Sequence, residues 1–395
     1  MSGDRIVRIA ARGDGVTADG RHAALAAPGD LLDADGRVTP GPHRQTPSCR
    51  HFPACGGCQL QHLDEVSLAD FVRDRVVGAL AAQSITAEVR PALLSPPRTR
   101  RRATLHAEKR GIIGFAESGS HALIDLAQCE VLHPALFALV APLRRLLPPL
   151  IPAKRRAEIE LTLADQGVDL LVRGVQANGL AAAEALTAFA QTHGLARLAI
   201  DEGLGPETRW EPDAATITLG GVPVPLPHGA FLQATAHGEA ALVAAVTEAL
   251  GQQTAPVADL FAGLGTFALA LGGRVYAAEG ARDAAMALKA AAARAGRPVF
   301  VEHRDLFRRP LMPAELDRFG AVVLDPPRAG AREQIAQLAQ SAVPIIAYVS
   351  CNPSSFARDV KTLCEAGWRI DWVQPVGQFR WSTHVELAAR LSRQP

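Results

Sequence analysis

The chain has 395 residues, of which 48% are hydrophobic and 21% are charged, and its formal net charge is +1. This length is too great for one ordinary domain, so we expect two or three domains. The high apolar content excludes an intrinsically disordered chain, which would contain far fewer such residues.

Basic residues gather in three short runs, although the net charge alone does not indicate a nucleic-acid partner. The runs lie within residues 98–102, 154–156 and 308–309 and consist almost entirely of arginine. A guanidinium group matches phosphate and stacks on bases, so the first run is a candidate for contact with a nucleic-acid backbone. For each run, a solvated surface is the alternative.

No segment has the pattern of a secretion signal or a membrane span. Residues 1–15 lack an apolar stretch, and the most apolar region, residues 136–151, is interrupted by Arg144 and Arg145. We therefore expect a cytoplasmic protein without a membrane partner. In such a reducing compartment, the six cysteines are expected to bind metal or to act in catalysis rather than to form disulfides.

The first half of the chain is predicted to form two small domains. Residues 5–35 alternate between polar and apolar side chains with glycine turns, which predicts a β-barrel of the OB type within a domain at residues 1–45. A helix is predicted at residues 67–83. Residues 98–227 read as β-hairpins with helices near 134–147 and 179–193, so residues 46–228 are expected to form a central α+β domain.

After residue 228 the pattern changes to short apolar runs alternating with helical segments. One such helix ends at Gly296, a suitable capping residue. Buried strands that alternate with helices indicate a parallel sheet. Residues 229–395 are therefore predicted to form a Rossmann-like α/β domain, and the whole chain a multidomain α/β protein.

Four cysteines form a candidate metal site in the central domain. Cys49, Cys55 and Cys58 have C-x5-C-x2-C spacing, and Cys129 lies far downstream. Four thiolates can complete a tetrahedral zinc site or hold a [4Fe–4S] cluster, and the spacing leaves both open. The C-x3-C-x2-C spacing of radical enzymes is absent from the sequence.

A glycine loop follows the first strand of the α/β domain and indicates a cofactor site. Gly263 and Gly265 let the backbone approach a ligand, and Glu279 ends the next strand, where its carboxylate can bind ribose hydroxyls. The loop also fits a nicotinamide fingerprint. However, Asp325 with two following prolines ends a later strand, which is typical of methyltransferases that act on nucleobases.

A thiol and a carboxylate supply candidate catalytic groups. Cys351 follows an apolar strand, which places it at the ligand-binding edge of the sheet. A thiolate that adds to carbon 6 of uracil makes carbon 5 nucleophilic toward a methyl sulfonium. Glu386 is a candidate base for the carbon 5 proton, and strand alternation predicts His384 on the same face.

With these motifs, the chain resembles the RNA 5-methyluridine (uracil-C5) methyltransferase family over nearly all of its length. The four cysteines resemble the [4Fe–4S] signature of the bacterial 23S rRNA branch, and the N-terminal segment resembles a TRAM module, an OB-like barrel, truncated after Asp35. The resemblance implies Cys351 as nucleophile and Glu386 as general base. It also implies an S-adenosylmethionine and uracil site that includes Gln233, Phe261, Glu279, Asp305 and Asp325. Ala262, Thr266 and the Ala234–Thr235 pair depart from the residues usual in the family.

The expected function is methylation of uridine C5 in 23S rRNA by a monomeric enzyme with S-adenosylmethionine and a [4Fe–4S] cluster. Three alternatives stay open. They are the same reaction on tRNA, a catalytically idle RNA-binding or remodelling factor, and a nicotinamide oxidoreductase.

Overall fold

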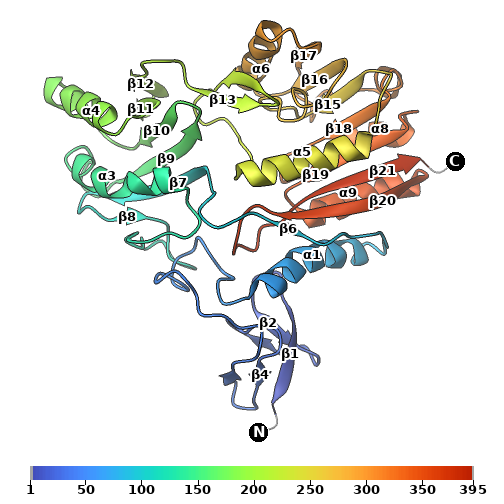
Figure 1. The fold of residues 1–395 in the computed structure, drawn as a ribbon, viewed down its shortest axis with the longest axis horizontal. Coiled ribbons are helices and arrows are strands. Elements are labelled where there is room, and N and C mark those ends of the chain that lie inside the picture. The colour runs from blue at the N-terminus through green and yellow to red at the C-terminus, as the bar shows by residue number, and fades with distance from the viewer. Residues whose placement is uncertain (1–2, 394–395) are drawn as a thin grey trace.

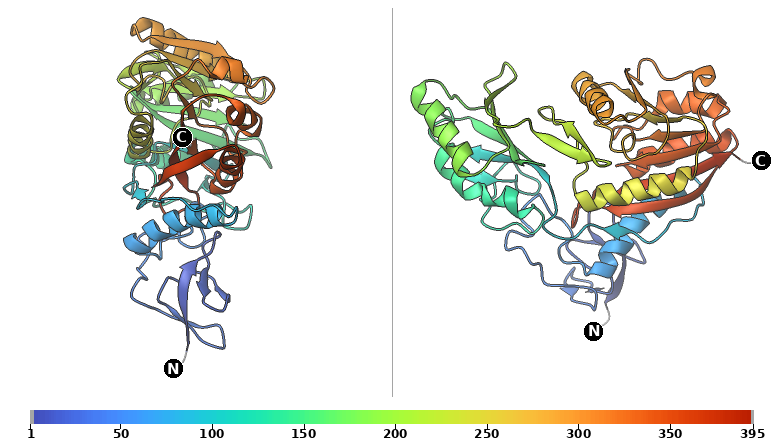
Figure 2. Two further views of the ribbon diagram at one scale, coloured as in Figure 1. Left: turned by 90° about the vertical axis from the view of Figure 1, so that its right-hand side faces the viewer. Right: turned by 45° about the horizontal axis from the view of Figure 1, so that its top comes forward.

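The structure is a computed structural model that describes residues 3–393. A small N-terminal sheet lies below two larger parts (Figure 1), which a tilted view shows as the two arms of a V (Figure 2). No helix within the described residues is long and apolar enough to cross a membrane.

The N-terminal part is a five-stranded antiparallel sheet with the order β3-β2-β1-β4-β5. It confirms the short strands predicted within residues 5–35 and continues to Thr39. Its core is small and contains Ile6, Ala23, Ala26 and Leu32. The strands are β1 (Asp4–Ile9), β2 (Gly15–Thr17), β3 (His22–Ala23), β4 (Leu31–Leu32) and β5 (Val38–Thr39).

The central part is a six-stranded mixed sheet with the order β12-β11-β10-β9-β7-β8. Its long hairpin, β9 to β10, is one of the β-hairpins predicted within residues 98–227. Of its three helices, α2 packs on β9, α4 packs on β11 and β12, and α3 packs on the other two helices. They fall within the predicted helical segments near residues 134–147 and 179–193. The elements are β7 (Arg102–Glu108), β8 (Ile113–Gly114), α2 (Pro134–Ala138), α3 (Val140–Leu146), β9 (Arg156–Ala164), β10 (Gly167–Arg173), α4 (Leu180–Thr192), β11 (Arg197–Asp201) and β12 (Pro206–Trp210).

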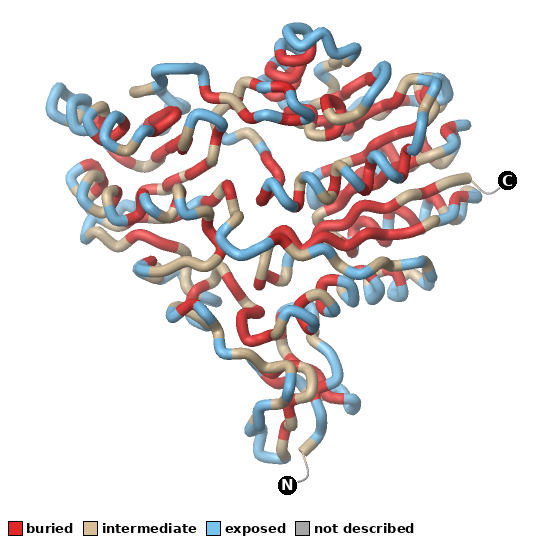
Figure 3. Tube along the Cα trace, viewed as in Figure 1, coloured by how far each residue is buried: buried red, intermediate tan, exposed pale blue. Residues whose placement is uncertain are grey.

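The C-terminal part is an eight-stranded sheet with the order β17-β16-β15-β18-β19-β21-β20-β6. Five neighbouring strands are parallel. The four inner ones, β16, β15, β18 and β19, are almost wholly buried (Figure 3), whereas the edge strand β17 is partly exposed. This confirms the predicted α/β class. The parallel strands are β15 (Val257–Leu260), β16 (Val275–Glu279), β17 (Val299–His303), β18 (Ala321–Leu324) and β19 (Ile345–Ser350). The remaining elements are α5 (Ala236–Leu250), α6 (Arg282–Arg294), α7 (Pro313–Leu316), α8 (Arg332–Gln340), α9 (Pro353–Glu365), β20 (Trp368–Gly377) and β21 (Glu386–Arg393).

Three segments connect these parts in a way that the sequence pattern does not reveal. The predicted helix is α1 (Glu65–Ala81), which packs on α9 and β20, and β6 (Leu93–Leu94) pairs with β20. The hairpin of β13 (Thr216–Leu219) and β14 (Val222–Pro225) packs on α6. These segments lie within the predicted central domain but bury their apolar faces against the C-terminal part. The boundaries at residues 45 and 228 stay predictions.

Candidate active site

One edge of the C-terminal sheet collects most of the predicted site residues. Phe261, Asp325 and Cys351 directly follow β15, β18 and β19, and Glu279 is the last residue of β16. These four strands are neighbours in the order β16-β15-β18-β19, so their carboxyl ends share one edge. The antiparallel β21 pairs with β19, and its register of Ser350 with Leu387 brings Glu386, the first residue of β21, beside Cys351.

Cys351, Asp325 and Glu386 form a cluster of acidic groups, in which Glu386 is buried and the other two are partly buried. Burial and the charge of Asp325 raise the pKa of Glu386 to about 8. Burial and the charge of Glu279 raise the pKa of Asp325 to about 7. Burial, followed by the charges of Glu386 and Asp325, raises the pKa of the Cys351 thiol to about 11. Without a bound cation, this cluster therefore retains protons near neutral pH.

A pair of glutamines joins this cluster to the segment before α5. The Gln378 side-chain Nε2 donates to Gln233 Oε1 at 2.8 Å, and Gln378 Oε1 accepts from the backbone N–H of Ala234 at 2.9 Å. Gln233 Nε2 then lies 3.5 Å from Asp325 Oδ2. Gln378 also lowers the pKa of Glu386 by hydrogen bonding. No sequence motif marked Gln378, although a polar residue directly after the apolar end of β20 was a signal for it.

Two positions in the loop after β15 are occupied by glycine for different structural reasons. Gly263 has φ of 55°, and a Cβ there would meet open space, so a ligand can approach its backbone. Gly265 has φ of 93°, and a Cβ there would lie 2.4 Å from Leu288 Cδ1, so this glycine is required for packing. Glu279 supports the loop, because its Oε2 accepts from the Gly263 N–H at 2.8 Å.

Asp259 is a second residue that the sequence analysis missed. Its side chain is fully buried, and Oδ2 accepts from the Ala268 N–H at 2.9 Å, whereas Oδ1 has no hydrogen-bond partner among the described residues. Burial and the charge of Asp325 raise its pKa to about 8. A buried carboxylate oxygen without a donor is a group that a cationic ligand can satisfy. Its position at the end of a buried strand was the available signal.

Two aromatic side chains lie on the other side of the glycine loop. Phe261 has φ of 64°, and its ring centroid lies 5.4 Å from that of Phe307, which is 42% exposed. The Asp305 Oδ1 atom accepts from the Phe307 N–H at 3.0 Å and therefore holds this turn. Asp305 lies near Glu279, because a Cβ on Gly280 would lie 3.7 Å from the Asp305 Cα.

One expectation about charged residues is wrong. His384 does not share a strand face with Glu386, because β21 begins only at Glu386, which is buried while His384 is exposed. Much of the first arginine run is engaged within the protein. Arg98 pairs with Glu130 at 2.9 Å, and the buried Arg101 pairs with Glu239 of α5. Local sequence cannot reveal these partners, because they come from other segments.

The four cysteines of the central domain line one cavity, together with Gln61, Phe115 and Val131 among others. Cys49, Cys55 and Cys58 are buried, and Cys129 is partly buried. Backbone N–H groups of Gly57, Val131 and Leu132 face sulfurs of this set. No group of three or more His, Cys, Asp or Glu side chains in residues 3–393 is arranged to hold a metal ion.

Comparisons with known proteins agree with this arrangement. A profile of the tRNA (Uracil-5-)-methyltransferase family matches residues 299–394. The chain is 52% identical to an uncharacterized RNA methyltransferase of Zymomonas mobilis, over 98% of this chain and 99% of the relative. It is 32% identical to a 23S rRNA (uracil(1939)-C(5))-methyltransferase of Thiobacillus denitrificans, over 90% of this chain and 87% of the relative.

A solved structure shows the same fold. It is the tRNA (uracil-54, C5)-methyltransferase of Pyrococcus abyssi in complex with S-adenosyl-L-homocysteine, with a TM-score of 0.76 and 23% identity, covering 98% of this chain and 99% of that one. The parallel sheet with its open glycine loop defines a Rossmann-like, cofactor-dependent enzyme. The chain belongs to the family of RNA (uracil-5-)-methyltransferases, which are S-adenosylmethionine-dependent enzymes.

Proposed function

We propose that the protein methylates carbon 5 of a uridine in 23S rRNA, with Cys351 as covalent nucleophile and Glu386 as general base. The observation that carries this proposal is the placement of Cys351, Asp325 and Glu386 at one sheet edge, next to the open Gly263 loop. A thiol and a carboxylate from adjacent strands can act on one pyrimidine ring that lies between them.

The proposed reaction begins when the Cys351 thiol releases its proton to solvent and its sulfur bonds to carbon 6 of the uracil, which moves the electrons of the ring double bond toward carbon 5 and the carbon 4 oxygen. Carbon 5 then attacks the methyl group that S-adenosylmethionine would supply when bound, and the bond between this methyl group and the sulfonium sulfur breaks. Glu386, in its ionised form, removes the proton from carbon 5, the ring double bond re-forms, and the bond from sulfur to carbon 6 breaks. The Arg328 charge lowers the pKa of Cys351 and so favours the thiolate that starts the sequence.

The residues at the sheet edge fit S-adenosylmethionine. The unpartnered Asp259 Oδ1 and the raised pKa of Asp325 mark a site that favours a positively charged ligand. We assign Gln233, Phe261, Gly263, Gly265, Glu279, Asp305 and Asp325 to this site. Gly263 offers backbone approach, and Phe261 offers an apolar surface.

We propose that Cys49, Cys55, Cys58 and Cys129 hold a [4Fe–4S] cluster. All four line one cavity, and backbone N–H groups face their sulfurs, as at iron–sulfur sites. A single zinc ion held by the same four thiolates is the alternative. Iron and sulfide content against zinc content tests this assignment.

Ribosomal RNA is favoured over tRNA by the relative named for 23S rRNA and by the proposed cluster. The alternative substrate is tRNA, which is named in the matching family profile and in the similar solved structure. Nucleoside analysis of both RNA classes from a deletion strain separates the two. We further propose that the protein is a cytoplasmic monomer whose N-terminal sheet is a TRAM-like barrel, and that its domains comprise residues 1–45, 46–228 and 229–395.

Methyl transfer to RNA from a labelled cofactor tests the mechanism. Cys351→Ala should abolish formation of 5-methyluridine, whereas Cys364→Ala, which removes a thiol from α9, should not. Glu386→Gln should accumulate an RNA adduct that survives denaturation, because the carbon 5 proton then has no acceptor. Full turnover by Cys351→Ala would disprove covalent catalysis by this residue.

A further inference from the structure

A row of cationic and aromatic side chains lies beside the candidate active site. The Arg100 Cζ atom lies 5.5 Å from the centroid of the Phe379 ring, and the Phe379 and His384 ring centroids are 5.7 Å apart. The pKa of His384 is lowered first by partial desolvation of the ring and then by the charges of Arg328 and Arg100, so both guanidinium groups lie near this imidazole. We call these four residues the stacking row.

The stacking row is continuous with the groups that carry the proposed chemistry. Phe379 directly follows Gln378, whose amide contacts Gln233 and Glu386. Arg328 belongs to the loop after Asp325, and its charge acts on both Cys351 and His384. A molecule bound on the row therefore lies next to whatever occupies the space between Cys351 and Glu386.

The two arginines of the row lack the internal partners that their neighbours have. Arg98 and Arg101 form ion pairs, but neither Arg100 nor Arg328 does so within residues 3–393. The Arg100 Nε atom donates to the Arg102 carbonyl at 3.0 Å, which fixes the side chain and leaves its terminal nitrogens for a ligand. Burial lowers the pKa of Arg100, so its charge is partly desolvated, and an anion would compensate for this loss of hydration.

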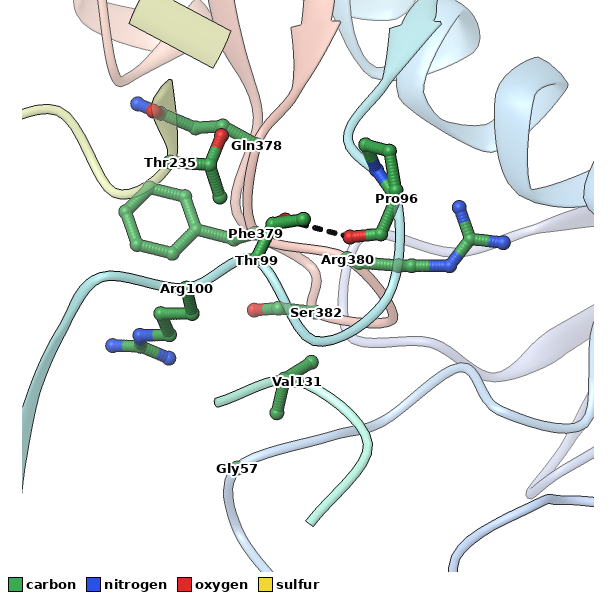
Figure 4. A pocket seen from close by; sticks show the side chains of 10 residues that line it. All are labelled: Gly57, Pro96, Thr99, Arg100, Val131, Thr235, Gln378, Phe379, Arg380 and Ser382. Carbon is green, nitrogen blue, oxygen red and sulfur yellow. Dashed lines mark hydrogen bonds between the residues drawn. The ribbon is translucent and has the colours of Figure 1, made fainter. Parts of the chain in front are cut away.

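A cavity borders the row and shows which parts of the chain enclose it. Thr99, Arg100, Phe379 and Ser382 line it, and Gly57 and Val131 come from the segments that carry the cysteines (Figure 4). In this view the Arg100 and Phe379 side chains lie on the same side of the cavity. The cysteine-bearing segments thus form a wall of a cavity that is also lined by Gln378, the residue that hydrogen-bonds to Glu386.

We infer that the stacking row binds the ribonucleotide next to the target uridine. The neighbouring base stacks on Phe379, and its phosphate contacts Arg100 and Arg328. A uridine that enters an active site leaves its neighbours unstacked, and aromatic and guanidinium planes replace that lost stacking. This inference rests on the proposed function, because it assigns a substrate position relative to Cys351 and Glu386.

The stacking contact is tested by removing the Phe379 ring from the protein and, separately, the flanking base from the RNA. The probe is a short single-stranded RNA with one uridine among adenosines, with binding measured by fluorescence anisotropy. Phe379→Leu should weaken binding about tenfold, and replacement of one flanking adenosine by an abasic site should weaken binding to the wild-type protein by a similar factor. The two changes together should cost no more than either alone. Losses that multiply, or unchanged affinity of Phe379→Leu, would overturn the inference.

A charge substitution provides a second readout that does not depend on the aromatic ring. Arg100→Met should reduce the slope of log affinity against log salt by about 0.7, the value for one phosphate contact on a single strand. Arg318→Met is the matched control, because Arg318 also lies over an aromatic ring, that of Tyr276. Arg318 precedes β18 and therefore lies at the amino ends of the parallel strands, whereas the candidate active site lies at their carboxyl ends. An equal change of slope in both variants would overturn the inference.

Methyl transfer distinguishes the two proposals. If the wild-type protein methylates the RNA and Phe379→Leu binds it normally, the stacking row is refuted and the proposed function stands. If the non-additive loss is observed but no RNA is methylated by the wild-type protein, the proposed function is refuted and the binding surface stands.

Discussion

The ion pair between Arg101 and Glu239 offers a sharp test of how the central and C-terminal parts are joined. Arg101 directly precedes β7, and Glu239 lies in the first turn of α5. Their side chains are only 8% and 15% exposed, and Arg101 also donates to the Gln233 carbonyl at 3.0 Å. We predict that Glu239→Gln lowers the free energy of unfolding by about 3–5 kcal/mol, because it leaves a buried guanidinium charge without its counter-ion.

A second Arg–Glu pair on the same helix is the matched control. Glu248 of α5 pairs with Arg90 at 2.7 Å, but the two side chains are 54% and 26% exposed. Glu248→Gln should therefore cost less than about 1 kcal/mol. A double variant, Arg101→Leu with Glu239→Leu, removes both buried charges and should recover most of the stability that Glu239→Gln loses.

The assay is equilibrium unfolding in urea, followed by far-UV circular dichroism and by intrinsic fluorescence. Transitions that coincide between the two probes allow the free energies of the variants to be compared. Equal costs of about 1 kcal/mol for Glu239→Gln and Glu248→Gln would refute the reasoning, since burial would then make no difference to the value of the pair.

Three further predictions concern the acidic cluster. The native pKa values of Asp259, Asp325 and Glu386 are about 8, 7 and 8, above the ordinary values of 3.8, 3.8 and 4.5. The native state therefore binds more protons than the unfolded state, and thermal stability should fall as the pH rises from about 4 to 8; a flat profile would contradict these shifts. Asp259→Asn should weaken binding of S-adenosylmethionine by about tenfold or more in calorimetry above pH 8, where the Asp259 carboxylate is ionised, through loss of a charged hydrogen bond. Unchanged affinity would show that Asp259 does not contact the cofactor. Gln378→Leu should lower kcat and move its pH dependence to higher pH, because Gln378 holds down the pKa of Glu386; a lower kcat with an unmoved profile would indicate a merely structural role.

Residues that carry chemistry were predictable where they directly follow buried strands or end them. Glu279, Asp325 and Cys351 were found in this way, because apolar runs mark parallel strands and the carboxyl ends of such strands share one edge. Cysteine spacing likewise identified the set of Cys49, Cys55, Cys58 and Cys129. These features depend only on neighbouring residues, so they can be recognised in the sequence.

The tertiary structure decided everything that depends on a distant partner. Arg101 meets Glu239 across 138 residues, and Gln378 meets Gln233 across 145 residues. Neither pair produces a local pattern, so the first arginine run looked like one uniform surface and Gln378 went unnoticed. In the same way, α1 packs on α9 and β20, and β6 pairs with β20, so both contacts form only after the chain has folded. Periodicity states which face of an element is apolar, whereas packing selects the surface that covers it.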